Sequence, residues 1–413
     1  MNTAQLLRTP SFFGLALLGF VLALYPASAQ ANTPPWVEKK VFEIEDFTFF
    51  NGETIDYVSV GWQSYGELNE ARDNAILITH FFSGSSHVAG RYEEGGALGY
   101  WDAIVGPGKA IDTDEYFVIS VDTLVNQEPH NPYVTTTGPA TYNRKTGERY
   151  GMDFPVTTIR DFVNVQKALI DSMGIDTLHA VIGASMGSLQ AIDWASAYPD
   201  RVERMVSVIG MAQADPWTVL SLQQWAEPIL NDPNWQGGEY YDSEPPSAGL
   251  QQALMQISLQ AMHPRAINTM FVDASNLESA PLKDIHSYHS TVEWLRERAS
   301  ERARYADANH ILYLVRANQL FITGMQENLD SGLARIQART FFMPASGDLL
   351  LLPSMARLAH ERLLDFGRDS QYVEIDGDWG HLDGIVSIEK QADVLREFLQ
   401  ESASEEQESA SDE

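Results

Sequence analysis

The sequence predicts an α/β protein in which a mostly parallel, doubly wound sheet carries an inserted helical cap. Short β-type runs alternate with helical patterns along residues 40–212 and again along residues 338–400. Between these two core parts, residues 213–337 contain long helical patterns and little strand signal. A Gly-x-Ser-x-Gly turn at residues 183–187 joins one strand to a helix. Strand–helix alternation of this kind builds a parallel sheet with helices on both faces.

Residues 1–31 have the pattern of a secretory signal peptide. Arg8 provides a positive start, residues 11–25 are almost wholly apolar, and small residues at 27–29 offer a cleavage site. The apolar run is short for a membrane span. We therefore expect an exported protein, periplasmic or secreted, with an uncleaved N-terminal anchor as the alternative. No later stretch is apolar for long enough to predict stable membrane insertion.

The composition narrows the range of partners. The chain carries 57 acidic and 27 basic residues, for a formal net charge of −30. Such a surface repels nucleic acid and anionic lipid headgroups, so neither is an expected partner. Cysteine is absent, which excludes thiolate nucleophiles and cysteine-based zinc sites. Residues 401–413 are acidic and rich in Ser, a composition typical of a disordered tail.

The predicted strands of the first core part follow in order. Residues 41–49 and 57–65 alternate between apolar and polar side chains, which predicts an antiparallel pair. Residues 75–79 and 116–121 are continuous apolar runs, as expected of buried parallel strands. Residues 156–173 then repeat apolar side chains at helical spacing.

The Gly-x-Ser-x-Gly turn is the most informative motif. An apolar run at 179–182 precedes it, and residues 188–195 with helical spacing follow it. This context resembles the nucleophile elbow of α/β-hydrolases, in which a tight turn exposes a serine hydroxyl to a general base. Ser185 is therefore the predicted nucleophile. The alternative is an ordinary Gly/Ser turn between a strand and a helix.

An acid and a base follow this serine in the chain, each after one of the remaining predicted core strands. After a strand at 204–209 and the helical segment, runs at 339–343 and 371–375 are the last two predicted strands. Asp348 follows the first of these and His381 follows the second. In α/β-hydrolases the chain order is Ser, then the acid, then His. The predicted triad is Ser185–His381–Asp348, and the neighbouring acids Asp376, Asp378 and Asp383 are the competitors of Asp348.

An acyl-transfer site also needs donors for the oxyanion. We expect the backbone N–H of Met186, after the nucleophile, and that of Phe82, in the loop at 80–87 after the 75–79 strand. The ten histidines show no two-His spacing with a partner acid that predicts a metal site. No cofactor is suggested either, and the expected ligands are a small-molecule acyl donor and acceptor. A homodimer is compatible with the sequence.

Several blocks of this chain resemble the homoserine O-acetyltransferase family of α/β-hydrolase-fold enzymes. The blocks are residues 64–69, 80–90, 101–102 with 105–113, 153–155 with 158–161, 183–187 and 232–240. The resemblance covers residues 40–400. It implies a two-step mechanism, in which the serine takes an acetyl group from acetyl-CoA and passes it to a hydroxyl acceptor. It also assigns the triad to Ser185, Asp348 and His381.

The chain departs from this family at the positions that recognise the acceptor. Leu382 stands where the family has an Asp for the acceptor's amino group, and Asp383 lies one residue later. Ala226 stands where the family has an Arg for the acceptor's carboxylate. Residues 126–132 replace a Gly-rich segment. Each lost charge-assisted contact is worth roughly 1.5–3 kcal/mol, so we expect an acceptor other than homoserine.

Three functions follow from these residues. The leading hypothesis is an exported serine acyl-transfer enzyme with a non-homoserine acceptor, water included, which would make it an esterase. A true homoserine O-acetyltransferase using acetyl-CoA in methionine biosynthesis is the second. A catalytically idle binding protein that keeps the fold is the third.

Overall fold

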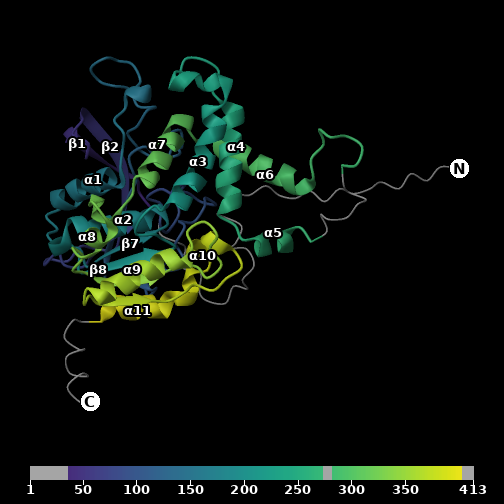
Figure 1. The fold of residues 1–413 in the computed structure, drawn as a ribbon. Helices are drawn as coiled ribbons and strands as arrows, with labels where there is room; N and C mark the ends of the chain where they lie inside the picture. The colour runs from purple at the N-terminus through teal and green to yellow at the C-terminus, as the bar shows by residue number, and fades with distance from the viewer. Residues whose placement is uncertain (1–35, 273–280, 402–413) are drawn as a thin grey trace.

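An eight-stranded sheet forms the centre of the molecule. The computed structural model describes residues 36–272 and 281–401, shown in Figure 1. The strand order is β1-β2-β6-β3-β7-β8-β9-β10. The bounds are β1 Lys40–Thr48, β2 Thr54–Tyr65, β3 Ala75–Thr79, β6 Phe117–Val121, β7 Ala180–Ala184, β8 Arg204–Val208, β9 Arg339–Met343 and β10 Ser370–Tyr372. The β1–β2 and β2–β6 pairs are antiparallel, and the other neighbours are parallel. The predicted α/β class with a mostly parallel sheet is confirmed.

Helices cover both faces of this sheet. One face packs against α1 Ile159–Ser172, α2 Met186–Ala197 and α9 Pro353–Asp365. The opposite face packs against α11 Ala392–Gln400 and the segment around the small β4 Val105–Gly106 and β5 Ile111–Asp112 pair. All five residues of β3, β7 and β8 are buried. This two-sided burial explains why the central strands are continuous apolar runs.

Helix α1 begins later than the apolar spacing predicts. Residues 156–157 stay outside it, and Thr158 adopts an extended backbone as the N-cap. The carboxylate of Asp161 accepts a 2.7 Å hydrogen bond from the Thr158 N–H. This reciprocal capping arrangement sets the helix start.

The segment between β8 and β9 is helical. Its helices are α3 Pro216–Leu230, α4 Ser247–Gln260, α5 Pro264–Met270, α6 Ser290–Ala303, α7 Ala308–Gln319 and the short α8 Leu329–Leu333. Helices α3, α4, α6 and α7 lie above β7 and β8 in the view of Figure 1. Helix α4 contacts both α3 and α6, and α3 also contacts α7. We call α3 to α7 the cap helices.

One predicted feature of this segment is wrong. The helical pattern over residues 290–321 is two helices, because α6 ends at Ala303 and α7 begins at Ala308 with Asp307 as its N-cap. The Asp307 side chain accepts a hydrogen bond from the N–H of His310 and one from the hydroxyl of Tyr240. These contacts make Asp307 the N-cap of a new helix.

Both ends of the chain lie outside the residues that the structure describes. The predicted signal peptide lies outside the described residues, and so does the acidic tail from residue 402 onward. Over residues 36–272 and 281–401, no helix combines the length and apolar character that a membrane crossing requires.

Candidate active site

Ser185 lies in a strained turn between β7 and α2. Its φ of 55° and ψ of −121° are rare for any residue other than glycine. The flanking glycines leave room for this turn. A Cβ on Gly183 would collide with the backbone of Gly187, and one on Gly187 would collide with the backbone of Thr79. The turn therefore holds the Ser185 side chain at the carboxyl edge of the parallel strands.

The structure brings Ser185, His381 and Asp348 together. The hydroxyl of Ser185 lies 2.8 Å from Nε2 of His381. On the other side of the ring, Nδ1 lies 2.6 Å from Oδ2 of Asp348. All three residues are buried, with Ser185 9% exposed. In this geometry Nε2 accepts the serine proton while the carboxylate fixes the tautomer of the imidazole, as an activated serine nucleophile requires.

The other oxygen of Asp348 holds the turn after β9. It accepts hydrogen bonds from the backbone N–H groups of Leu350 and Leu351, at 2.8 and 3.0 Å. The carboxylate therefore has partners on both oxygens, which fixes its orientation toward His381.

The three competing acids have partners elsewhere. Asp376 accepts a hydrogen bond from the Ser346 hydroxyl, and Asp378 forms an exposed ion pair with Arg265. The buried Asp383 accepts hydrogen bonds from the backbone N–H groups of Trp379 and Gly380. Asp348 alone among these four carboxylates is hydrogen-bonded to His381.

The two predicted oxyanion donors lie on adjoining segments. Met186 is the first residue of α2, where backbone N–H groups have no intrahelical acceptor. Phe82 follows β3, whose last residue Thr79 donates a 2.7 Å hydrogen bond to the Gly187 carbonyl. Gln190 ties the two segments together, because its amide nitrogen lies 3.2 Å from the carbonyls of both His80 and Met186.

The cap helices contact the loops that carry this site. The backbone N–H of Leu382 donates to the Ala261 carbonyl, and that of His263 donates to the Trp379 carbonyl. The Trp225 ring on α3 packs edge-on against Phe82, with centroids 5.2 Å apart. The indole N–H of Trp225 donates to Gln260 on α4 at 2.8 Å. The cap is thus in contact with both the loop that carries His381 and the loop at 80–87 that carries Phe82, which we call the oxyanion loop after its predicted role.

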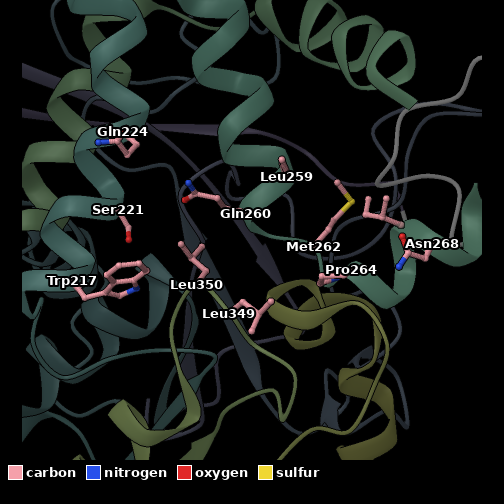
Figure 2. Close-up of a pocket in the computed structure, with 11 residues that line it drawn as sticks. Trp217, Ser221, Gln224, Leu259, Gln260, Met262, Pro264, Asn268, Leu349 and Leu350 are labelled. Atoms are coloured by element: carbon pink, nitrogen blue, oxygen red, sulfur yellow. The ribbon is translucent and has the colours of Figure 1, made fainter. Parts of the chain in front are cut away.

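An open groove of about 530 Å³ lies between the cap helices and the turn after Asp348, as Figure 2 shows. Its lining contains no charged side chain. The lining residues are Trp217, Ser221 and Gln224 of α3, Leu259 and Gln260 of α4, Met262, Pro264, Ile267 and Asn268, and Leu349 and Leu350. In a chain with 57 acidic residues, an uncharged groove along the turn that follows Asp348 is a distinctive surface. We call it the cap groove.

At the positions where the sequence departs from the homoserine O-acetyltransferase pattern, the side chains are either apolar or hydrogen-bonded within the protein. Leu382 is half-buried in a short turn next to His381, and Ala226 is buried in α3. Asp383 does not replace the missing acid at 382, because its carboxylate is buried against the loop backbone. In the segment at 126–132, the Asn126 amide donates to the Gly84 carbonyl and so supports the oxyanion loop.

Sequence reasoning missed the cap groove, because its lining comes from four separate segments without a shared motif. It also missed the backbone clamp made by Asp383. Among residues 36–272 and 281–401, no group of three or more His, Asp or Glu side chains is placed to hold a metal ion.

Known proteins resemble this chain over most of its length. Residues 95–387 match the family described as alpha/beta hydrolase fold. A homoserine O-acetyltransferase of Symbiobacterium thermophilum is 36% identical over 359 residues, which cover 86% of this chain and 92% of that protein. The crystal structure of an esterase called E22 has a TM-score of 0.86 and 56% identity, covering 88% of this chain and 100% of that one. The structure of homoserine O-acetyltransferase from Bacillus anthracis has a TM-score of 0.86 and 36% identity, covering 90% and 99%.

Proposed function

The chain belongs to the homoserine O-acetyltransferase-like family of α/β-hydrolase-fold enzymes, and from this premise we propose that it is an exported serine acyl-transfer enzyme that hydrolyses uncharged esters. The observation that carries the proposal is the hydrogen-bonded series Ser185–His381–Asp348. An uncharged groove lined by Leu349 and Leu350, the two residues after Asp348, supports it. The higher identity to an esterase than to an acetyltransferase supports the same choice.

The reaction runs in two halves at Ser185. In the first, Nε2 of His381 takes the hydroxyl proton as Oγ attacks the ester carbonyl carbon. The N–H groups of Phe82 and Met186 stabilise the resulting oxyanion. His381 then gives its proton to the alcohol oxygen, the carbon–oxygen bond breaks, and an acyl-enzyme remains. In the second half, water attacks the acyl-enzyme with His381 again as the base, which releases the acid and restores Ser185.

Homoserine is a poor fit to this site. Its ammonium group has no carboxylate at Leu382, and its carboxylate has no guanidinium at Ala226. The cap groove also has no charge for either group or for the phosphates of a coenzyme A donor. An uncharged ester leaves no buried charge unpaired there. We therefore assign the apolar part of the ester substrate to the cap groove.

The export part of the proposal rests on residues 1–31, whose apolar run and small-residue site are typical of a cleaved signal peptide. Outside the inner membrane, water is the most available acceptor for an acyl-enzyme. Mass spectrometry of the purified protein should find a mature N-terminus near residue 30. An intact Met1 in the exported fraction would contradict cleavage.

Rapid mixing with p-nitrophenyl acetate tests the enzymatic proposal. A burst of nitrophenol equal to the enzyme concentration should precede steady turnover in the wild type. Ser185→Ala should show neither, whereas Ser346→Ala, with an exposed hydroxyl on a nearby loop, should behave as the wild type does. Turnover by Ser185→Ala would overturn the mechanism.

Two further outcomes separate the alternatives. Incubation with acetyl-CoA and homoserine should yield no O-acetylhomoserine, and product formation would favour the biosynthetic acetyltransferase. A fluorophosphonate probe should label Ser185, and a fully folded wild type that resists labelling would favour an idle binding protein.

A further inference from the structure

His80 lies directly after β3, at the start of the oxyanion loop. Its side chain is fully buried. The Nδ1 atom of the ring lies 2.8 Å from the backbone carbonyl oxygen of Phe81, the next residue. The Nε2 atom accepts a 3.0 Å hydrogen bond from the backbone N–H of Thr123, after β6. The mechanism described above makes no use of this histidine.

The partners of the ring determine its tautomer. A backbone N–H is a donor only, so Nε2 must be the unprotonated acceptor in its contact with Thr123. Nδ1 therefore carries the proton and donates it to the Phe81 carbonyl. Burial lowers the pKa of His80 below its ordinary value, which keeps the ring in this neutral form.

The Phe81 carbonyl belongs to the same peptide unit as the Phe82 N–H. A trans peptide is planar, so its C=O and N–H point in opposite directions. A donor that holds the Phe81 oxygen consequently directs the Phe82 N–H away from the donor. The N–H of Gly84 is a second donor to the same oxygen, at 2.9 Å. Two donors, the His80 ring and the Gly84 N–H, thus fix the rotation of this one peptide plane.

We propose that His80 is a positioning residue that aims the Phe82 N–H into the oxyanion hole. The inference rests on the proposed acyl-transfer function, in which Phe82 is an oxyanion donor. His80 touches neither substrate nor the triad and acts through the Phe81–Phe82 peptide. Its alternative role is a structural tie between the loops after β3 and β6, made through the Nε2 contact with Thr123.

Two substitutions separate these roles. In His80→Asn, the side-chain amide nitrogen takes the bonding position of Nδ1 and keeps the donor to Phe81, but the acceptor for Thr123 is lost. In His80→Gln, the amide reaches the position of Nε2 and keeps the acceptor for Thr123, but no donor remains near Phe81. The readouts are kcat and KM for p-nitrophenyl acetate, the inhibition constant of an alkylboronic acid, which mimics the tetrahedral oxyanion, and the melting temperature.

A positioning role predicts that His80→Gln lowers kcat by about 10- to 100-fold with KM within threefold of the wild type, since loss of a whole oxyanion donor costs about 100- to 1000-fold. Binding of the boronic acid should weaken by the same factor. His80→Asn should stay within about fivefold of wild-type kcat, even if its melting temperature is lower. Equal kcat losses in the two variants, or full activity of His80→Gln, would overturn the inference. Failure of the proposed function would be visible separately, as a wild type with no burst and no boronate inhibition.

Discussion

The carboxylate of Asp383 accepts a 2.9 Å hydrogen bond from the backbone N–H of Gly380, the residue before His381. It also accepts one from the N–H of Trp379 at 2.9 Å and one from the Ser387 hydroxyl. The buried acid thus clamps the turn that presents His381 to Ser185. Asp383 lies close to His381 in the sequence, but its carboxylate binds groups of its own loop and does not face a ligand.

Removing this clamp should cost stability and activity together. Asp383→Ala leaves the backbone N–H groups of Trp379 and Gly380 without this acceptor, and hydrogen bonds to a charged group are worth about 1.5–3 kcal/mol. We expect the free energy of unfolding in urea to fall by about that amount, with a lower kcat. Asp383→Asn keeps an acceptor oxygen for Gly380 and should lose less than half as much. Equal stability of the alanine variant and the wild type would show that the clamp is dispensable.

The identity of the triad acid leads to a second prediction. Asp348→Asn keeps one oxygen for Leu350 and Leu351 but turns an amide toward Nδ1 of His381, which disfavours the tautomer that activates Ser185. The kcat for ester hydrolysis should fall by about 1000-fold or more at nearly unchanged melting temperature. Asp376→Asn and Asp378→Asn should retain wild-type kcat. A larger loss in either of them would reassign the acid.

The parts of the fold that sequence predicts well are those set by local pattern. The bounds of β3 and β9 agree with the predicted runs at 75–79 and 339–343, because central strands are apolar on both faces and end where polar loops begin. The meeting of Ser185, Asp348 and His381 follows from the order in which parallel strands end at one edge. Neither inference needs knowledge of tertiary contacts.

Features that depend on distant contacts were not predicted. The break before α7 comes from Asp307, whose partner Tyr240 lies 67 residues earlier. The roles of His80 and Asp383 depend on loop conformations that no periodicity describes. The cap groove has the same origin, since its walls come from separate helices and a turn. In each case, tertiary hydrogen bonding or packing overrides the local pattern.

Leu382 provides a test of acceptor choice. Leu382→Asp places a carboxylate beside His381, where it would attract the ammonium group of an amino alcohol by about 1.5–3 kcal/mol. With p-nitrophenyl acetate as donor, the ratio of transfer to hydrolysis should rise for ethanolamine. It should rise less for homoserine, because Ala226 offers nothing to the carboxylate. Leu382→Asn is the uncharged control, and an equal gain in that variant would rule out charge as the cause.

A buried histidine in the cap predicts a dependence of stability on pH. His310 of α7 lies within hydrogen-bonding distance of the Asn126 carbonyl through Nδ1 and accepts from the Ala140 N–H through Nε2. Burial lowers the pKa of His310, and the neighbouring Asp307 only partly opposes this, while His130 adds to it. The unfolded chain therefore binds a proton more readily than the folded chain. The stabilisation is complete above about pH 6.5 and is lost as the pH falls toward the lowered pKa.

Urea unfolding between pH 7.5 and 5.5 measures this effect. The wild type should lose up to about 1 kcal/mol more than His310→Asn over the unit below pH 6.5, because Asn keeps the donor to Asn126 and does not titrate in this range. Other buried histidines, His80 among them, supply a slope that both proteins share. Parallel stability curves for the two proteins would exclude His310 as a contributor.

The uncharged cap groove predicts that kcat/KM rises with the chain length of the ester substrate. A methylene that leaves water for this uncharged surface should contribute about 0.8 kcal/mol, or about fourfold in kcat/KM. We expect such a rise in at least one of two ester series, one lengthening the acyl chain and the other the alcohol.

Leu349→Asp, at an exposed position of the groove wall, should flatten that series while acetate turnover stays within about threefold. Leu358→Asp, exposed on α9 outside the groove, is the matched control. A chain-length profile unchanged by Leu349→Asp would remove the cap groove from the substrate path, because a carboxylate in contact with an alkyl chain must weaken its binding.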